Sequence, residues 1–287
     1  MNSMAGSEEA KPASSVASPV KVDKKAVFIS QEKARAAKFV SASNYIENVT
    51  EINMSKPESM SQGHGKAYLE AYQLGVDKKP ITVEHFLKWQ KMITTESHTV
   101  GHDIPKEGLG QLRGPNRPNE VQVVGGDATV IHTGTKHTEV KSQMDSFVLE
   151  LNDKLSKCPN GNAMFTADIL GYAFFKYEKI QPFIDGNGRS GRLLFPFIAG
   201  FTRTAVPMVN VSSDQLMDSF YSAHDSENKM KQLVAGYSKS AVIKDGRLFV
   251  KSDNPNDGNS YFSTEKGSKE RVIFEWHQFD RYFRELK

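Results

Sequence analysis

A stretch of twelve residues, Gln181 to Arg192, constrains the fold more than any other part of the chain. It reads Gln-Pro-Phe-Ile-Asp-Gly-Asn-Gly-Arg-Ser-Gly-Arg and is followed by an apolar run at 193–195. The segment that precedes it, 167–177, has the length and the apolar spacing of a helix rather than of a buried strand. The stretch is therefore predicted to be a glycine-rich loop between two helices, at 166–179 and 188–202.

The loop carries residue types that bind phosphate groups. Gly186 and Gly188 flank Asn187, so backbone N–H groups there can approach an anion closely, and the N-terminus of the following helix would contribute about half a positive charge. Arg189 and Arg192 are three residues apart. On a helix they face the same side, and each can hold phosphate oxygens through two parallel hydrogen bonds. The pattern predicts a cradle for a polyphosphate.

A carboxylate stands directly before this cradle. Asp185 could hold Mg²⁺, which prefers oxygen ligands and commonly bridges a carboxylate and nucleotide phosphates. Mg²⁺ is therefore the expected cofactor, and ATP or another nucleotide is the expected substrate.

Two other interpretations of the glycines explain less. The spacing at 186, 188 and 191 also satisfies the G-x-G-x-x-G fingerprint of dinucleotide-binding folds. That fingerprint follows a buried strand, with an acidic residue about 20 positions further on. Asp214 lies at a tolerable distance, but no β-rich run leads into the loop. A plain helix-capping turn would suit the glycines, but it leaves the paired arginines unexplained.

The same stretch resembles the signature of the Fic (Fic/Doc, or Fido) family, H-P-F-x-D/E-G-N-G-R-x-x-R. Every fixed position matches except the first, where Gln181 stands in place of histidine. The resemblance implies a mainly helical fold that transfers a phosphate-containing group, usually AMP from ATP, to a protein hydroxyl. It also implies that Pro182 and Phe183 fix the loop against the core, and that the missing histidine is the base that takes the proton from the attacking hydroxyl.

A predicted β-hairpin lies upstream of the signature. Val121–Val124 and Thr129–His132 alternate around a glycine-rich turn, and Gly110–Arg113 comes before them. This arrangement resembles the family's flap, which implies that a target protein docks by strand addition near residues 121–132. The alternative is a surface hairpin without a binding partner.

A second motif near the N-terminus bears on the first. Ser43 to Asn48 fits the family's inhibitory pattern [S/T]-x-x-x-E-[G/N], with Ser43 and Glu47 four residues apart on one helix face. In relatives that glutamate pairs with the second signature arginine, here Arg192. A carboxylate and the γ-phosphate would then compete for one guanidinium group. The alternative is an ordinary solvated helix end.

Gln181 puts catalysis in doubt because an amide does not titrate. The loss of a general base typically costs about 10²–10⁴ in rate. Three outcomes stay open. Another group, of which His132 and His137 are the candidates, could serve as base. The pocket could perform a different reaction, such as AMP removal with Glu47 orienting water, or transfer of another group. The chain could also be a non-catalytic nucleotide- or protein-binding module.

Composition is that of an ordinary globular protein. The 287 residues are 38% hydrophobic and 25% charged, with a net charge of +3, and no basic stripe indicates nucleic-acid binding. The single cysteine, Cys158, excludes a disulfide within the chain and is typical of a reducing compartment. No secretory signal or membrane span is visible, so the expected location is the cytoplasm. The short, basic, Ser-rich start would also suit a bacterial effector delivered into a host cell.

The expected architecture is mainly α: a Fic-type helical core with a β-hairpin flap and a C-terminal β-hairpin. The predicted regions are a disordered tail (1–25), an inhibitory helical segment (26–60), the Fic domain (61–240) and a C-terminal extension (241–287). Beyond the helices already named, the apolar spacing predicts a helix at 30–40 and a second short helix that ends near 47. It also predicts helices at 68–74, 82–93, 137–155, 213–224, 227–240 and 271–286. The segment 97–119 is predicted to be a loop, and 242–250 a hairpin.

Overall fold

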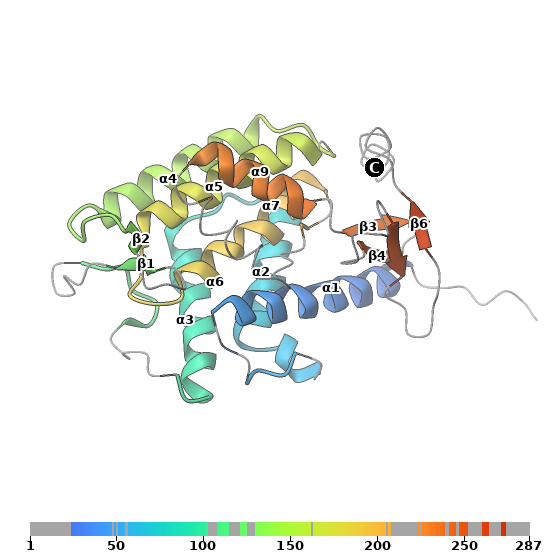
Figure 1. Ribbon diagram of the computed structural model, residues 1–287, viewed down its shortest axis with the longest axis horizontal. Coiled ribbons are helices and arrows are strands. Elements are labelled where there is room, and N and C mark those ends of the chain that lie inside the picture. The colour runs from blue at the N-terminus through green and yellow to red at the C-terminus, as the bar shows by residue number, and fades with distance from the viewer. Residues whose placement is uncertain are drawn as a thin grey trace, which may run out of the picture.

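The computed structural model describes residues 24–47, 49, 51–54, 57–102, 108–114, 121–124, 130–161, 163–204, 206–207, 223 and 226–238, and the strands at 241–244, 247–251, 260–263 and 271–273. These residues form a mainly helical protein with a small antiparallel hairpin, as predicted (Figure 1). In chain order the helices are α1 (Lys24–Ile46), the 3₁₀ helix η1 (Pro57–Met60), α2 (Gly63–Val76), α3 (Val83–Thr99), α4 (Val140–Ser156), α5 (Ala163–Ile180), α6 (Asn187–Arg192), α7 (Leu194–Thr202) and α9 (Glu227–Ser238).

The core forms around α5 and α7. Helix α5 packs against α4, α7 and α9, and α2 packs against α7, α3 and α1 (Figure 1). Aromatic side chains join these layers: the rings of Phe86 and Tyr177 stack 5.0 Å apart, and Phe174 meets Phe195 edge-on at 5.4 Å. The short helix α6 contacts α1, α3 and α5. The signature loop therefore lies where four helices meet.

Helix α3 begins where the sequence predicts it, after the N-cap residue Thr82. Thr82 has extended backbone angles, and its N–H donates to Nδ1 of His85 over 3.1 Å. The apolar face of the helix is buried at Phe86, Trp89 and Ile93, as the spacing predicts. The helix continues to Thr99, so the predicted loop begins later than residue 97.

Two other helix predictions are corrected. The segments expected at 30–40 and near 47 form one helix, α1, which begins at Lys24 inside the predicted tail. The helix expected at 188–202 is interrupted at Leu193. Pro196 has no N–H to offer the carbonyl four residues earlier, but it is tolerated in the first turn of a new helix. The chain therefore restarts as α7.

The strands occur where the hairpins are predicted. Strands β1 (Gln122–Val124) and β2 (Val130–Thr133) pair antiparallel, with an irregularity after Val123. Strands β3 (Ala241–Lys244) and β4 (Arg247–Lys251) form the C-terminal hairpin and continue into a sheet with β5 (Ser260–Ser263) and β6 (Arg271–Ile273). The helix predicted from 271 is wrong for 271–273, because a short apolar run takes the structure of the strand it pairs with.

Several predictions fall on other parts of the chain. The helix at 213–224, apart from residue 223, and the tail at 1–23 lie outside the described residues. Within the part that the structure describes, no helix combines the length and the apolar character that a bilayer crossing requires.

Candidate functional site

The signature loop is closed by its own asparagine. The side chain of Asn187 accepts the N–H of Phe183 and donates to the carbonyl of Phe183, both over 2.8 Å. Phe183 is fully buried and anchors the turn in the core, as predicted. Gly186, with φ +78°, precedes α6 in the left-handed conformation that glycine adopts without steric cost.

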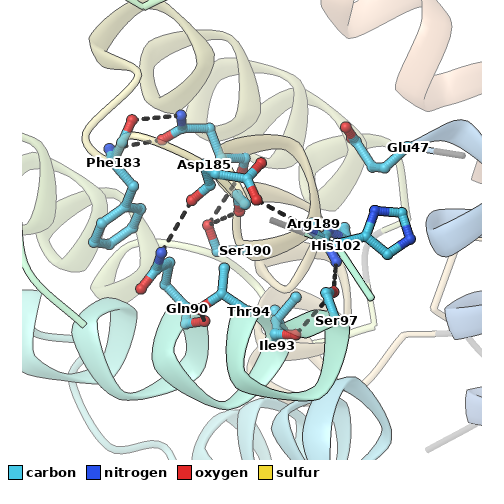
Figure 2. A network of polar contacts seen from close by, with 12 residues as sticks. Glu47, Gln90, Ile93, Thr94, Ser97, His102, Phe183, Asp185, Arg189 and Ser190 are labelled. Atoms are coloured by element: carbon cyan, nitrogen blue, oxygen red, sulfur yellow. Dashed lines mark hydrogen bonds and ion pairs between the residues drawn. The ribbon is translucent and has the colours of Figure 1, made fainter. Parts of the chain in front are cut away.

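Polar side chains of α3 support this loop from below. Nε2 of Gln90 donates to the carbonyl of Asp185 over 3.0 Å, and Oγ of Ser97 accepts a hydrogen bond from Nη1 of Arg189 (Figure 2). Thr94 lies between them, one turn along from Gln90. Sequence analysis missed these three residues. The signal was present, because polar residues at helical spacing on an otherwise apolar face must find partners when they are buried.

The two arginines of the signature are buried next to the glycine turn. Arg189 is 3% exposed, and its Nη2 lies 3.5 Å from Oδ2 of Asp185. Arg192 is fully buried. Within the described residues, Nε of Arg189 and Nη1 of Arg192 have no hydrogen-bond partner. Buried donors of this kind are normally satisfied, so both atoms are available for hydrogen bonds to an anion.

Helix α6 has only six residues, so its dipole contributes less than a long helix would. The positive charge of the site comes mainly from the guanidinium groups. Burial lowers the pKa of Arg189, while the carboxylates of Asp185 and Glu47 oppose that shift. The arrangement suits a ligand that carries more than one negative charge.

Asp185 turns its carboxylate outward. Its side chain is 44% exposed, and the distant contact with Arg189 leaves its oxygens open to a cation. Among the residues that the structure describes, no group of three His, Cys, Asp or Glu side chains could hold a metal ion. A cation at Asp185 would therefore need phosphate or water oxygens as further ligands.

The end of α1 lies over the cradle. Arg192 donates from Nε to Oγ of Ser43 over 2.7 Å, and from Nη2 to the carbonyl of Ser43 over 2.9 Å and to Oε1 of Glu47 over 2.6 Å. A Cβ added to Gly188 would collide with the Glu47 carboxylate. The carboxylate therefore occupies the space directly above the glycine turn. The pairing of Glu47 with Arg192 is the geometry that the motif predicts.

A buried histidine adds a tie that sequence analysis missed. Nδ1 of His64 lies 2.8 Å from Oδ1 of Asn44, and the backbone N–H of His64 donates to Oε2 of Glu96 over 2.8 Å. An amide oxygen can only accept, so Nδ1 carries the hydrogen. Burial, together with Arg189 and Arg192, lowers the pKa of His64 well below its ordinary value. His64 is therefore neutral and holds α1 through a residue next to Ser43.

Gln181 lies at the start of the loop in an unusual backbone conformation. Its φ of +47° is in the left-handed region, and the residue is 3% exposed. Its Nε2 donates to Oε2 of Glu178 over 2.7 Å. The amide is held toward α5 by a buried carboxylate.

The two histidines nominated as substitute bases lie in different settings. Nε2 of His132 bonds to the carbonyl of Lys179 over 3.0 Å, and its Nδ1 lies 3.3 Å from Nζ of Lys179. Both ring nitrogens are engaged, so His132 does not fit the role of a base. His137 lies in the turn before α4 and is partly exposed. Burial raises the pKa of the Cys158 thiol, which fits an inert cysteine rather than a nucleophile.

Comparisons with known proteins agree with this geometry. Residues 80–199 match the model of the Fic/DOC family. Two curated relatives, each named "Protein adenylyltransferase Fic", from Drosophila persimilis and Drosophila pseudoobscura pseudoobscura, are 30% identical over 135 residues. The match covers 46% of this chain but only 22% of each relative, so the chain spans a small part of their length.

The fold has a counterpart among solved structures. A Fic-domain-containing signaling protein from Bacteroides thetaiotaomicron superposes with a TM-score of 0.54 at 18% identity, over 75% of this chain and 85% of that one. The signature loop and helices α3, α4, α5 and α6 lie within the matched residues 80–199, whereas α1 lies outside them. Residues 80–199 of the chain are therefore similar to the Fic/DOC family, and the likeness to the Bacteroides structure is one of fold.

Proposed function

We propose that this chain is a Fic-domain nucleotide-binding protein whose family activity is the transfer of AMP from ATP to a protein hydroxyl. The observation that carries the proposal is the pair of buried guanidinium groups with unpartnered donor atoms on Arg189 and Arg192. They lie beside the glycine turn at 186–188, where a polyphosphate could approach the backbone. The name of the Drosophila relatives, protein adenylyltransferase, supports the same reaction.

In this reaction the acceptor hydroxyl oxygen bonds to the α-phosphorus, its proton passes to solvent, the bond from that phosphorus to the oxygen bridging the α- and β-phosphates breaks, and pyrophosphate leaves. Asn187 and its flanking glycines shape the turn, and Arg189 and Arg192 stabilise charge on the outer phosphates. Asp185 would hold Mg²⁺, which supplies further neutralisation of phosphate charge when it is bound. These residues fit the nucleotide phosphates and Mg²⁺, because Nε of Arg189 and Nη1 of Arg192 lack partners among the described residues and the Asp185 carboxylate is open to solvent.

The proposal includes an inhibitory role for the end of α1. Glu47 and a γ-phosphate would compete for Nη2 of Arg192 and for the space above Gly188. The hydroxyl and the carbonyl of Ser43 hold the same guanidinium, which keeps it oriented toward Glu47. ATP must displace the Glu47 carboxylate before its phosphates can occupy the cradle.

Gln181 limits the chemical step. Its amide cannot accept the hydroxyl proton, and it is bonded to Glu178. Because this bond holds the amide away from a catalytic role, a non-catalytic nucleotide- or protein-binding module is the second candidate function. Removal of AMP, or transfer of another phosphate-containing group in the same pocket, would also use the cradle without a base at position 181.

Labelling with α-³²P-ATP and Mg²⁺ tests the proposal. We expect little label on the native chain and strong self-labelling of the variant Gln181→His with Glu47→Gly. The matched control is Gln181→His with Asp145→Asn, which removes an exposed carboxylate on α4 and leaves Glu47 in place. A double variant that binds ATP by calorimetry but takes up no label would refute the transferase assignment, and ATP, GTP and CTP would be compared in both assays.

A further inference from the structure

The C-terminal end of α5 explains how the flap is placed. The last carbonyls of a helix have no partner within it and must be satisfied from outside. Here the hairpin supplies hydrogen-bond donors for some of these carbonyls. His132 bonds to the carbonyl of Lys179 over 3.0 Å, and the N–H of Thr135 donates to the carbonyl of Ile180 over 3.2 Å. The chain that leaves β2 is therefore tied to the last turn of the helix that ends at the signature.

Arg113 supplies further donors to carbonyls at the end of α5 and at the start of the signature. Its Nε donates to the carbonyl of Gln181 over 2.7 Å, its Nη2 donates to the carbonyl of Ile180 over 3.1 Å, and its own N–H donates to the carbonyl of Pro182 over 2.8 Å. The same Nη2 also donates to the carbonyl of Thr135 over 2.8 Å. One guanidinium group thus joins the start of the signature to the base of the flap.

Burial and the dipole of α5 strengthen the hydrogen bonds of Arg113. Arg113 is 2% exposed, so water does not compete for its donors. A cation at the carbonyl end of a helix is also favoured by the helix dipole. Because Gln181 has a left-handed backbone, its carbonyl direction depends on an external partner, and Arg113 is that partner.

Close packing reinforces the link. A Cβ added to Gly134 would lie 2.6 Å from Cβ of Gln181 and 3.0 Å from Nη2 of Arg113. Gly134 also donates its N–H to the carbonyl of Val121 across the base of the hairpin. The flap therefore rests directly on position 181.

We propose that Arg113 is a positioning residue that sets the flap in register with position 181, and so aims an acceptor hydroxyl on the flap at the base position. The inference rests on the proposed function, because it assigns the flap to the acceptor. We assign Arg113 no role in holding ATP, because its guanidinium donates to the carbonyls of Gln181, Thr135 and Ile180, on the α5 and flap side of the loop. Its loss should impair transfer while leaving nucleotide affinity intact.

The experiment compares Arg113→Lys, which keeps the charge but loses the fork, with Asn152→Ala. Asn152 is a structural control because its side chain also bonds to backbone, accepting the N–H of Ile81 and donating to the carbonyl of Ile81. Both changes are made in the Gln181→His, Glu47→Gly background. We expect Arg113→Lys to slow self-labelling at saturating ATP about 10–100-fold, the usual effect of a small misplacement, with the ATP Kd within twofold. Asn152→Ala should lower the melting temperature without slowing the labelling.

A second variant and a second readout keep the inference testable without catalysis. Gly134→Ala retains Arg113 but presses the new Cβ against Gln181, and it should slow labelling in the same way. In the native chain, Arg113→Lys should speed amide exchange in the peptides that cover 121–124 and 130–135, and leave α4 unchanged.

The inference is overturned if flap exchange stays unchanged, or if the ATP Kd rises as much as labelling falls. If the parent double variant takes up no label, the proposed function fails instead, and the exchange result alone decides the role of Arg113.

Discussion

Replacing Glu47 with glycine should tighten ATP binding and at the same time weaken the free protein. Oε1 of Glu47 lies 2.6 Å from Nη2 of Arg192, in a pair whose side chains are 34% and 1% exposed. Glu47 follows the last residue of α1, so glycine at this position removes no helical residue. The substitution therefore acts mainly through the lost carboxylate.

The size of the effect follows from the environment of the pair. A hydrogen bond to a charged group contributes about 1.5–3 kcal/mol to stability. Water reaches the Glu47 side, so we take about 1–2 kcal/mol after allowing for solvent screening. ATP no longer has to displace this interaction, and since 1.4 kcal/mol corresponds to a factor of ten, its Kd should fall about 5–30-fold. Without ATP, Arg192 keeps only its bonds to Ser43, and the melting temperature should drop by a few degrees.

Calorimetric titration with Mg-ATP and thermal melting with and without ATP measure both effects. Asp145→Asn is the control, because it removes a carboxylate from an exposed pair with Lys141 on α4 and should change neither quantity. The signature of competition is a melting temperature that is lower in the free variant but converges with that of the parent at saturating ATP. An ATP Kd within twofold of the parent value, in a variant that is folded, would refute the reasoning.

Three further predictions concern the cradle and its supports. Gly188→Ala should abolish ATP binding by calorimetry even with Glu47→Gly, because the new Cβ lies 3.0 Å from Nη1 of Arg192, whereas Gly114→Ala, whose Cβ meets nothing within 4 Å, should bind normally. Asn187→Ala should lower the free energy of unfolding in urea by about 2–4 kcal/mol, since it leaves two buried backbone groups unpaired. His64 is neutral when folded and protonates more readily when unfolded, so stability should fall as pH drops below about 6.5, by up to about 1.4 kcal/mol per unit. His64→Gln should flatten that part of the unfolding profile, and an unchanged slope would contradict the assignment.

The features that sequence alone predicts are those with strong local rules. The turn at 186–188 is recognisable because glycines and a following apolar run leave few other conformations, and Thr82 begins α3 because its hydroxyl side chain suits an N-cap. The hairpin strands near 121–133 follow from alternation around a glycine turn. Each of these depends on neighbours within a few residues.

The features that sequence does not predict depend on partners far along the chain. Ser43 and Asn44 would ordinarily weaken a helix interior, yet α1 continues through them because Arg192 and His64 take up their polar groups. In the same way, Arg113 shows its role only once the end of α5 is beside the flap. Long-range contacts of this kind leave no periodic trace.

Glu47 and Gln181 limit different steps of the proposed reaction: Glu47 limits ATP binding, and Gln181 limits proton removal from the acceptor hydroxyl. The two limits therefore respond differently to the ATP concentration. The ion pair of Glu47 with Arg192 is an equilibrium that a sufficient concentration of polyphosphate can shift. No ligand concentration gives an amide at position 181 the ability to accept a proton. Of these two positions, we therefore expect only residue 47 to affect ATP affinity, and we expect both to affect the labelling rate. In a double-mutant cycle the two changes should be additive in free energy, both for binding and for transfer at low ATP, because residue 47 sets how much ATP is bound and residue 181 sets how fast bound ATP reacts.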